Sequence, residues 1–192
     1  MASSGQRVGP ADPIDEMGNP STWIVGCQVE LQSTSDFVIL KLMPESAETQ
    51  LKGFIAKFDP AMSKLIRECR SILRKRFPTA NELVYDNYNF FVIGYCTTER
   101  PSDCVVSLAA NAKGVGLSFY HGATLPDPYG VLEGSGSQNR FVRLDGVDTL
   151  SRPEILELLR AAEAHASPGF LGAGGGKLII RSISEKQRPR RQ

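Results

Sequence analysis

The 192-residue sequence has no apolar run of the about 18 residues that a membrane-spanning helix needs. Its first residues also lack the basic start and apolar centre of a secretory signal. We therefore expect a cytoplasmic protein with no membrane partner. Cysteine is scarce and forms no C-x-x-C pair, so we expect reduced, structural thiols at Cys27, Cys69, Cys96 and Cys104.

Motifs of catalysis and metal binding are missing as well. The two histidines, His121 and His165, belong to no H-x-x-x-H or H-x-x-E pattern. The glycine-rich segment 134–140 matches neither the P-loop nor the dinucleotide-binding fingerprint. No activated nucleophile or positioned acid-base pair can be recognised. The sequence thus favours a protein that is not an enzyme and that holds no cofactor and no metal ion of its own.

The net charge of +1 hides an asymmetry along the chain, because acidic residues predominate in the first fifty positions. Basic residues gather in the segment 64–76 and again in the last residues, 186–191. A basic helix face is typical of a solvated surface, and binding to phosphate or nucleic acid is the alternative. We do not expect a nucleic-acid partner, and the oligomeric state is left open.

Hydrophobic periodicity predicts helices on either side of a set of strands. Ser46 can cap a helix through Phe58, and Asp59 with Pro60 is a start signal for a long helix as far as Phe77. A capping box from Ser151 to Glu154 predicts a last helix that ends near His165. Alternating or continuous apolar runs predict strands at 82–85, 90–95, 104–110, 115–119 and 141–144.

The two ends of the chain are expected to be less regular. We predict disorder up to Ser21, possible strands at 23–29 and 37–43, and a flexible hinge at 172–176. The segment 177–183 could add an edge strand, and a solvated basic tail would follow it. These features divide the chain into an extension (1–45), an α+β domain (46–166) and a hinge with the possible edge strand and basic tail (167–192).

Several phrases of the sequence resemble a known family. They are RKRFPTANELVYDNYNFFVIGY, TERPSD, LSFYHGATLPDP and GSGSQNRFVRL, within residues 48–164. Together they resemble the YdhG-like family, whose function is unknown and whose bacterial members include a proposed frataxin-like iron chaperone. The resemblance implies an antiparallel sheet of about five strands with helices packed against it, which agrees with the α+β fold expected from periodicity.

A polar pocket is predicted where strand ends and their loops meet. The turn 85–89 is rich in Tyr, Asp and Asn, which suit a pocket wall or a hard cation, although turns use the same residues. His121 ends a strand and could be an acid, a base or a ligand, or simply bond to a loop. Segment 134–140 could bind phosphate or be a plain turn. The predicted ligand-binding residues are Tyr85, Asn87, Tyr88, Lys113, Tyr120, His121, Arg140 and Arg143.

The leading hypothesis is a non-enzymatic YdhG-like domain that binds a small anion or a phosphate-bearing metabolite. One alternative is a frataxin-like intracellular iron chaperone, for which iron would be transferred cargo. The long helix is basic and the acidic residues lie mostly outside the matching region, which counts against that role. The other alternative is an interaction module that binds acidic partners through its basic helix and tail.

Overall fold

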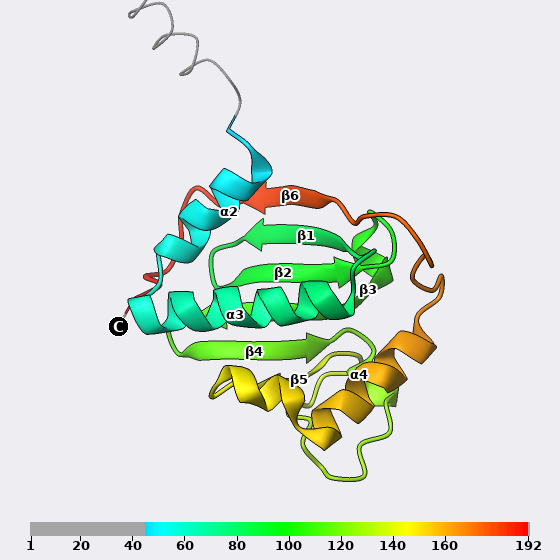
Figure 1. Ribbon diagram of the computed structural model, residues 1–192. Coiled ribbons are helices and arrows are strands. Elements are labelled where there is room, and N and C mark those ends of the chain that lie inside the picture. The colour runs from blue at the N-terminus through cyan, green and yellow to red at the C-terminus, as the bar shows by residue number, and fades with distance from the viewer. Residues whose placement is uncertain (1–44, 192) are drawn as a thin grey trace, which may run out of the picture. The chain divides into compact units, whose positions relative to one another are not determined.

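The computed structural model describes residues 45–191, and within them three helices pack on one face of a six-stranded sheet (Figure 1). The strand order is β5-β4-β3-β2-β1-β6. The expected disorder up to Ser21, the possible strands at 23–29 and 37–43, and Cys27 lie outside the described residues. The elements are α2 (Ala47–Ala56), α3 (Pro60–Arg76), β1 (Asn81–Asp86), β2 (Phe91–Cys96), β3 (Cys104–Asn111), β4 (Gly114–Phe119), β5 (Arg140–Arg143), α4 (Pro153–His165) and β6 (Leu178–Ile183).

The α+β class is confirmed, but the expected antiparallel sheet of about five strands is wrong. Strands β1 to β5 form an antiparallel series, and β6 adds a sixth strand that runs parallel to β1. A parallel neighbour requires a crossover connection, and here the chain between β1 and β6 makes the rest of the sheet and α4 first. The sheet is therefore mixed.

The helix starts differ in how they are capped. The Ser46 hydroxyl accepts a hydrogen bond from the Thr49 amide, as the sequence predicts for α2. Helix α3 begins at Pro60, but the Asp59 side chain makes no capping bond; its backbone carbonyl accepts from the Ser63 amide at 2.8 Å. The predicted capping box before α4 is wrong, because Arg152 directly precedes this helix and makes no side-chain cap.

The two faces of the sheet differ in side-chain size. On β3 and β4, Val106, Leu108, Leu117 and Phe119 are buried beneath the helices. Their sequence neighbours point to the opposite face, as the two-residue period of a strand requires. Those neighbours are small, namely Ser107, Ala109, Gly116 and Ser118. One face of the sheet therefore holds the core, and the other is left as an open face.

The basic face predicted on the long helix is partly neutralised. Arg70 is buried and bonds to both Glu48 and Glu82, at distances of 2.7–2.9 Å. Hydrogen bonding to Arg70 holds the pKa of the Glu48 carboxyl below its usual value. Arg76 likewise forms an ion pair, with Glu163 of α4. These residues tie helices to their neighbours, so α3 does not present all its charges to a partner.

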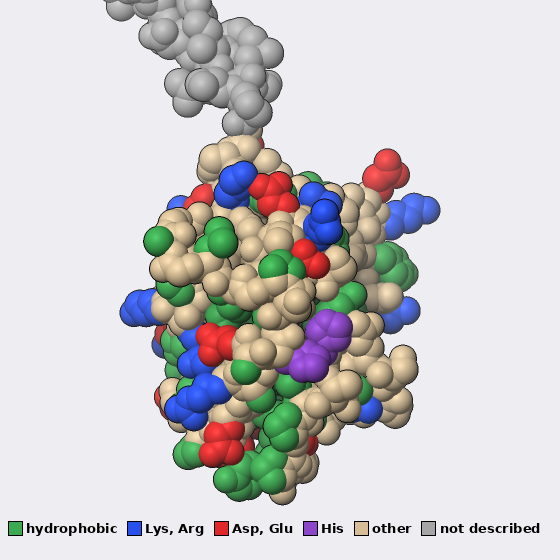
Figure 2. Space-filling model, turned by 90° about the vertical axis from the view of Figure 1, so that its right-hand side faces the viewer, with side chains coloured by type: hydrophobic (Ala, Val, Ile, Leu, Met, Phe, Trp, Pro, Cys, Tyr) green, Lys and Arg blue, Asp and Glu red, His purple; other side chains and the backbone are tan. Residues whose placement is uncertain are grey.

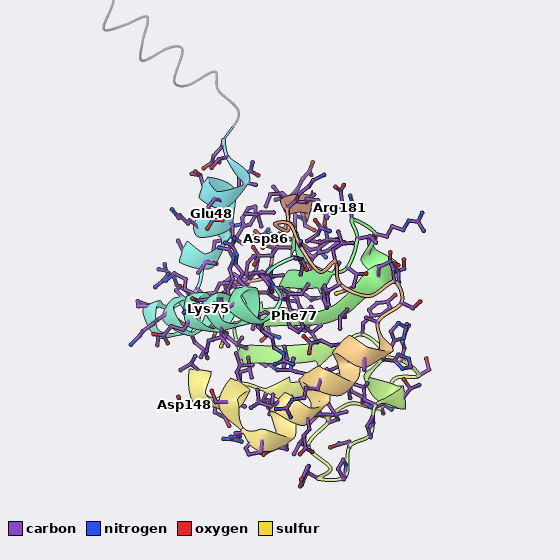
Figure 3. All side chains as sticks on the ribbon, turned by 45° about the vertical axis from the view of Figure 1, so that its right-hand side comes forward. Glu48, Lys75, Phe77, Asp86, Asp148 and Arg181 are labelled. Carbon is purple, nitrogen blue, oxygen red and sulfur yellow. The ribbon has the colours of Figure 1, made fainter. Side chains whose placement is uncertain are left out.

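The predicted solvated basic tail is observed in part: Lys186, Arg188 and Arg191 are exposed, but Arg190 is buried. Arg190 is only 4% exposed, and its Nη2 lies 3.1 Å from a carboxylate oxygen of Asp86, at the end of β1. Lys57 Nζ contacts the other oxygen at 2.5 Å. The Arg190 guanidinium also lies 5.8 Å from the ring centre of Phe58. Figure 3 shows Asp86 on the side of the domain where α2 lies.

Gly176 should be essential for attaching β6. A β-carbon at this position would overlap the backbone carbonyl of Ala80, and the Gly176 amide donates to the Pro78 carbonyl at 3.3 Å. We expect Gly176→Ala to lower the free energy of unfolding by about 1–3 kcal/mol, since the clash involves backbone. Gly175→Ala is the control, because no atom lies within 4 Å of the position that its β-carbon would take. Equal urea midpoints for the two variants would contradict this assignment.

Candidate functional site

A groove of about 870 Å³ occupies the open face of the sheet. Its floor is formed by Ala109 paired with Gly116, and by Ser107 paired with Ser118, on β3 and β4. None of these side chains is larger than that of serine, so the floor is shallow and partly polar. The register places Phe141 of β5 beside Ser118 and Arg143 beside Gly116, which forms one wall of the groove.

Aromatic and amide side chains form the opposite rim. Tyr88 and Phe90 lie in the β1–β2 turn and are 48% and 46% exposed, which is unusual for such large rings. Asn87 and Asn89 of the same turn also line the groove, as do Asn111 and Asn139. A mostly apolar lining with a few amides and hydroxyls is the usual composition of a site for a small organic ligand.

Two positively charged side chains, Lys113 and Arg143, line the groove. Lys113 lies in the β3–β4 turn, where its amide donates to Asn111 Oδ1 at 2.8 Å, and its side chain is exposed. Arg143 is also exposed, and its Nε lies 3.3 Å from Glu133. This surface ion pair is weak because both partners are hydrated. Asp145 is the acidic residue of the lining, so the groove carries a small excess of positive charge.

The structure separates the eight predicted site residues into two groups. Four of them line the groove: Asn87, Tyr88, Lys113 and Arg143. The other four, Tyr85, Tyr120, His121 and Arg140, do not line it. The expected meeting of Tyr88, His121 and Arg140 in one cavity is therefore not what the fold produces.

The residues outside the groove have other environments. The Arg140 guanidinium donates to the backbone carbonyls of Gly136 and Asn139, and so closes its own loop. Tyr85 lies on β1, between β2 and β6, and burial raises the pKa of its hydroxyl. The glycine-rich segment thus behaves as a turn held by its own arginine, which is the simpler of the two interpretations of the sequence.

His121 meets the other histidine of the chain. Its ring centre lies 5.6 Å from that of His165 at the end of α4 and 5.0 Å from that of Tyr120. Figure 2 shows the two histidines side by side on the surface. They line a small cleft of about 30 Å³ together with Asp103 and Cys104. Sequence spacing gives no sign of this pair, because the fold and not a helical turn brings the two residues together.

Within residues 45–191, no group of three or more His, Cys, Asp and Glu side chains is arranged to hold a metal ion. In the same range, no helix is long and apolar enough to span a bilayer. Comparisons with protein-family models, curated proteins and solved structures found no match. The groove and its lining are therefore the basis for a functional proposal.

Sequence reasoning missed the floor and two aromatic walls of the groove. Ser107, Ala109, Gly116 and Ser118 were available as a signal, because they alternate with large apolar residues along two adjacent strands. A strand with one large and one small face indicates a covered side and an open side. Phe90 and Phe141 were visible only as strand residues, and their exposure depends on which face each strand presents.

Proposed function

We propose that this chain is a non-enzymatic binding domain of the YdhG-like kind, whose open sheet face takes a small organic anion such as a phosphate-bearing metabolite. The observation that carries the proposal is the groove of about 870 Å³ with Lys113 and Arg143 beside its floor. This volume falls in the range of about 300–1,000 Å³ that is usual for small-molecule sites.

The lining suits a ligand with one flat apolar part and one charged part. A flat group can lie on Ala109 and Gly116 because their side chains leave room above the backbone. Phe90 and Phe141 offer ring surfaces at two borders of that floor. The anionic part would then reach Lys113 or Arg143, whose hydrogen bonds to an anion are charge-assisted.

The structure offers less support for the two alternatives, an iron chaperone and an interaction module for acidic partners. An iron-transfer site has no arranged carboxylate group among residues 45–191 to support it. A basic interaction surface is reduced by the ion pairs that Arg70 and Arg76 make inside the domain and by the burial of Arg190. The groove therefore supports ligand binding best.

Removing the two cations should weaken anion binding. A thermal-shift screen of inorganic phosphate, nucleotides and aromatic carboxylates would first find a ligand, and calorimetry would measure its affinity. We expect Lys113→Ala and Arg143→Ala each to lower that affinity about tenfold, which corresponds to about 1.4 kcal/mol. High salt should weaken binding as well, because the two cations are exposed to solvent.

Three control variants separate this effect from a general loss of charge or stability. Glu133→Ala removes the partner of Arg143 but keeps the cation, so binding should be retained or strengthened. Arg140→Ala should leave the affinity unchanged, because its guanidinium holds its own loop. Ala109→Leu should abolish binding by filling the floor while all charges remain. Absence of any stabilising ligand, or equal affinity of Ala109→Leu and the original chain, would refute the proposal.

A further inference from the structure

Two cysteines face each other across neighbouring strands, away from the groove. Cys96 ends β2 and Cys104 begins β3, and the two residues are direct partners in the antiparallel ladder. The register shifts next to them, between Tyr95 and Cys96, so that Val105 is the extra residue of a bulge. Direct ladder partners have Cα atoms about 4.5–5.5 Å apart, which lies inside the range of about 4.4–6.8 Å for disulfides.

The two sulfur atoms converge on the same small space. A β-carbon built at Gly94 would lie 3.1 Å from Cys104 Sγ and 3.5 Å from Cys96 Sγ. Because position 94 is a glycine, this space is left to the thiols. The neighbouring Cys104 thiol, together with burial, raises the pKa of Cys96 well above its usual value. The two sulfur atoms thus lie close together, on the same face of the sheet and next to a glycine that leaves room for them.

The two thiols differ in burial. Cys96 is only 1% exposed, whereas Cys104 is half-buried. A small reagent is therefore expected to reach Cys104 first. Cys69 lies apart from this pair, on α3 in the core, where it is fully buried and burial raises its pKa to about 11.

We propose that Cys96 and Cys104 form an oxidisable dithiol that a small-molecule disulfide converts into a cross-strand disulfide bond. The inference does not depend on the groove or its ligand. The Cys104 thiolate would attack one sulfur of the reagent, forming a mixed disulfide and releasing one thiolate. The Cys96 thiolate then attacks Cys104 Sγ and releases the second thiolate. Two cysteine thiols are oxidised, one reagent disulfide is reduced to two thiols, and the two protons end on the released thiols.

Oxidised glutathione is a suitable probe, applied to the folded full chain in buffers with increasing ratios of oxidised to reduced glutathione. Acid quenching and alkylation would trap the free thiols, and a glutamate-specific protease would cut after Glu99, between the two cysteines. We expect a linked Cys96–Cys104 peptide pair, with the chain losing two thiols and two hydrogen atoms. The fraction linked should rise with the ratio and return to zero with excess reduced glutathione.

Matched variants define the order of events. Cys96→Ser should stop at a mixed disulfide on Cys104, whereas Cys104→Ser should leave Cys96 reduced because Cys96 is buried. Cys69→Ala should leave the linkage unchanged. Circular dichroism of each variant before oxidation shows whether it is folded. Full reduction of both residues in oxidised glutathione alone, linkage of either to Cys27, or a mixed disulfide at Cys104 in the original chain that never passes to Cys96, would each overturn the proposal.

Discussion

Replacing Asp86 by alanine should lower the free energy of unfolding by about 3–5 kcal/mol, the usual cost of removing one partner of a buried ion pair. The Asp86 side chain is 1% exposed and lies between Lys57 and Arg190. Without it the Arg190 guanidinium, itself 3% exposed, would keep its charge in a buried position with no carboxylate beside it. Urea unfolding followed by circular dichroism measures the loss.

The control for this prediction is Asp148→Ala. Asp148 is exposed and lies in the short helical turn (Val147–Ser151) before α4, away from Asp86 (Figure 3). Its removal should change the free energy of unfolding by no more than about 0.5 kcal/mol, as is usual at the surface. Similar midpoints for the two variants would show that the buried charge cluster does not hold the C-terminal residues to the domain.

Phe91→Ala should be equally destabilising for a different reason. Phe91 is fully buried, and its ring centre lies 6.3 Å from that of Phe54 and 6.0 Å from that of Phe58. These contacts join α2 and the α2–α3 turn to the middle of the sheet. Truncating a buried phenylalanine costs about 3–5 kcal/mol, because it removes apolar contacts and leaves a cavity.

The preceding residue provides the control. Phe90 has the same side chain, but it is 46% exposed on the rim of the groove. We expect Phe90→Ala to cost about 1 kcal/mol or less, since little apolar surface is removed from the core. If thermal unfolding ranked Phe90→Ala below Phe91→Ala in Tm, the assignment of the two sheet faces would be wrong. The same comparison of Tm values, made with a bound ligand, would show whether Phe90 on the rim contributes to binding.

Local patterns in the sequence predicted most of the elements. The apolar stripe of α3 and the alternation in β3 and β4 gave correct types and nearly correct bounds, because both signals come from neighbouring residues. Ser46 was correctly identified as a cap for the same reason. Side chains that interact within one turn of helix or along one strand leave such signals in a single sequence.

Contacts between distant segments left no such signal. The parallel pairing of β6 with β1, the burial of Arg190 against Asp86, and the meeting of His121 with His165 each join residues that are far apart in the chain. For Arg190, the composition predicted an exposed side chain, because a basic terminus usually stays in water, but the side chain is buried. Only half of the predicted site residues line the groove. The edge of the sheet at which each turn lies depends on the topology, which local patterns in the sequence do not show.

The pairing of Asp86 with Arg190 also bears on how the chain matures as it is synthesised. These partners are 104 residues apart, and synthesis proceeds at about 5–20 residues per second. For several seconds after β1 has been synthesised, its outer edge therefore has no β6 to pair with, and the Asp86 carboxylate has no Arg190 beside it. During that interval the nascent domain exposes an unpaired strand edge, which is the kind of surface that molecular chaperones protect from aggregation.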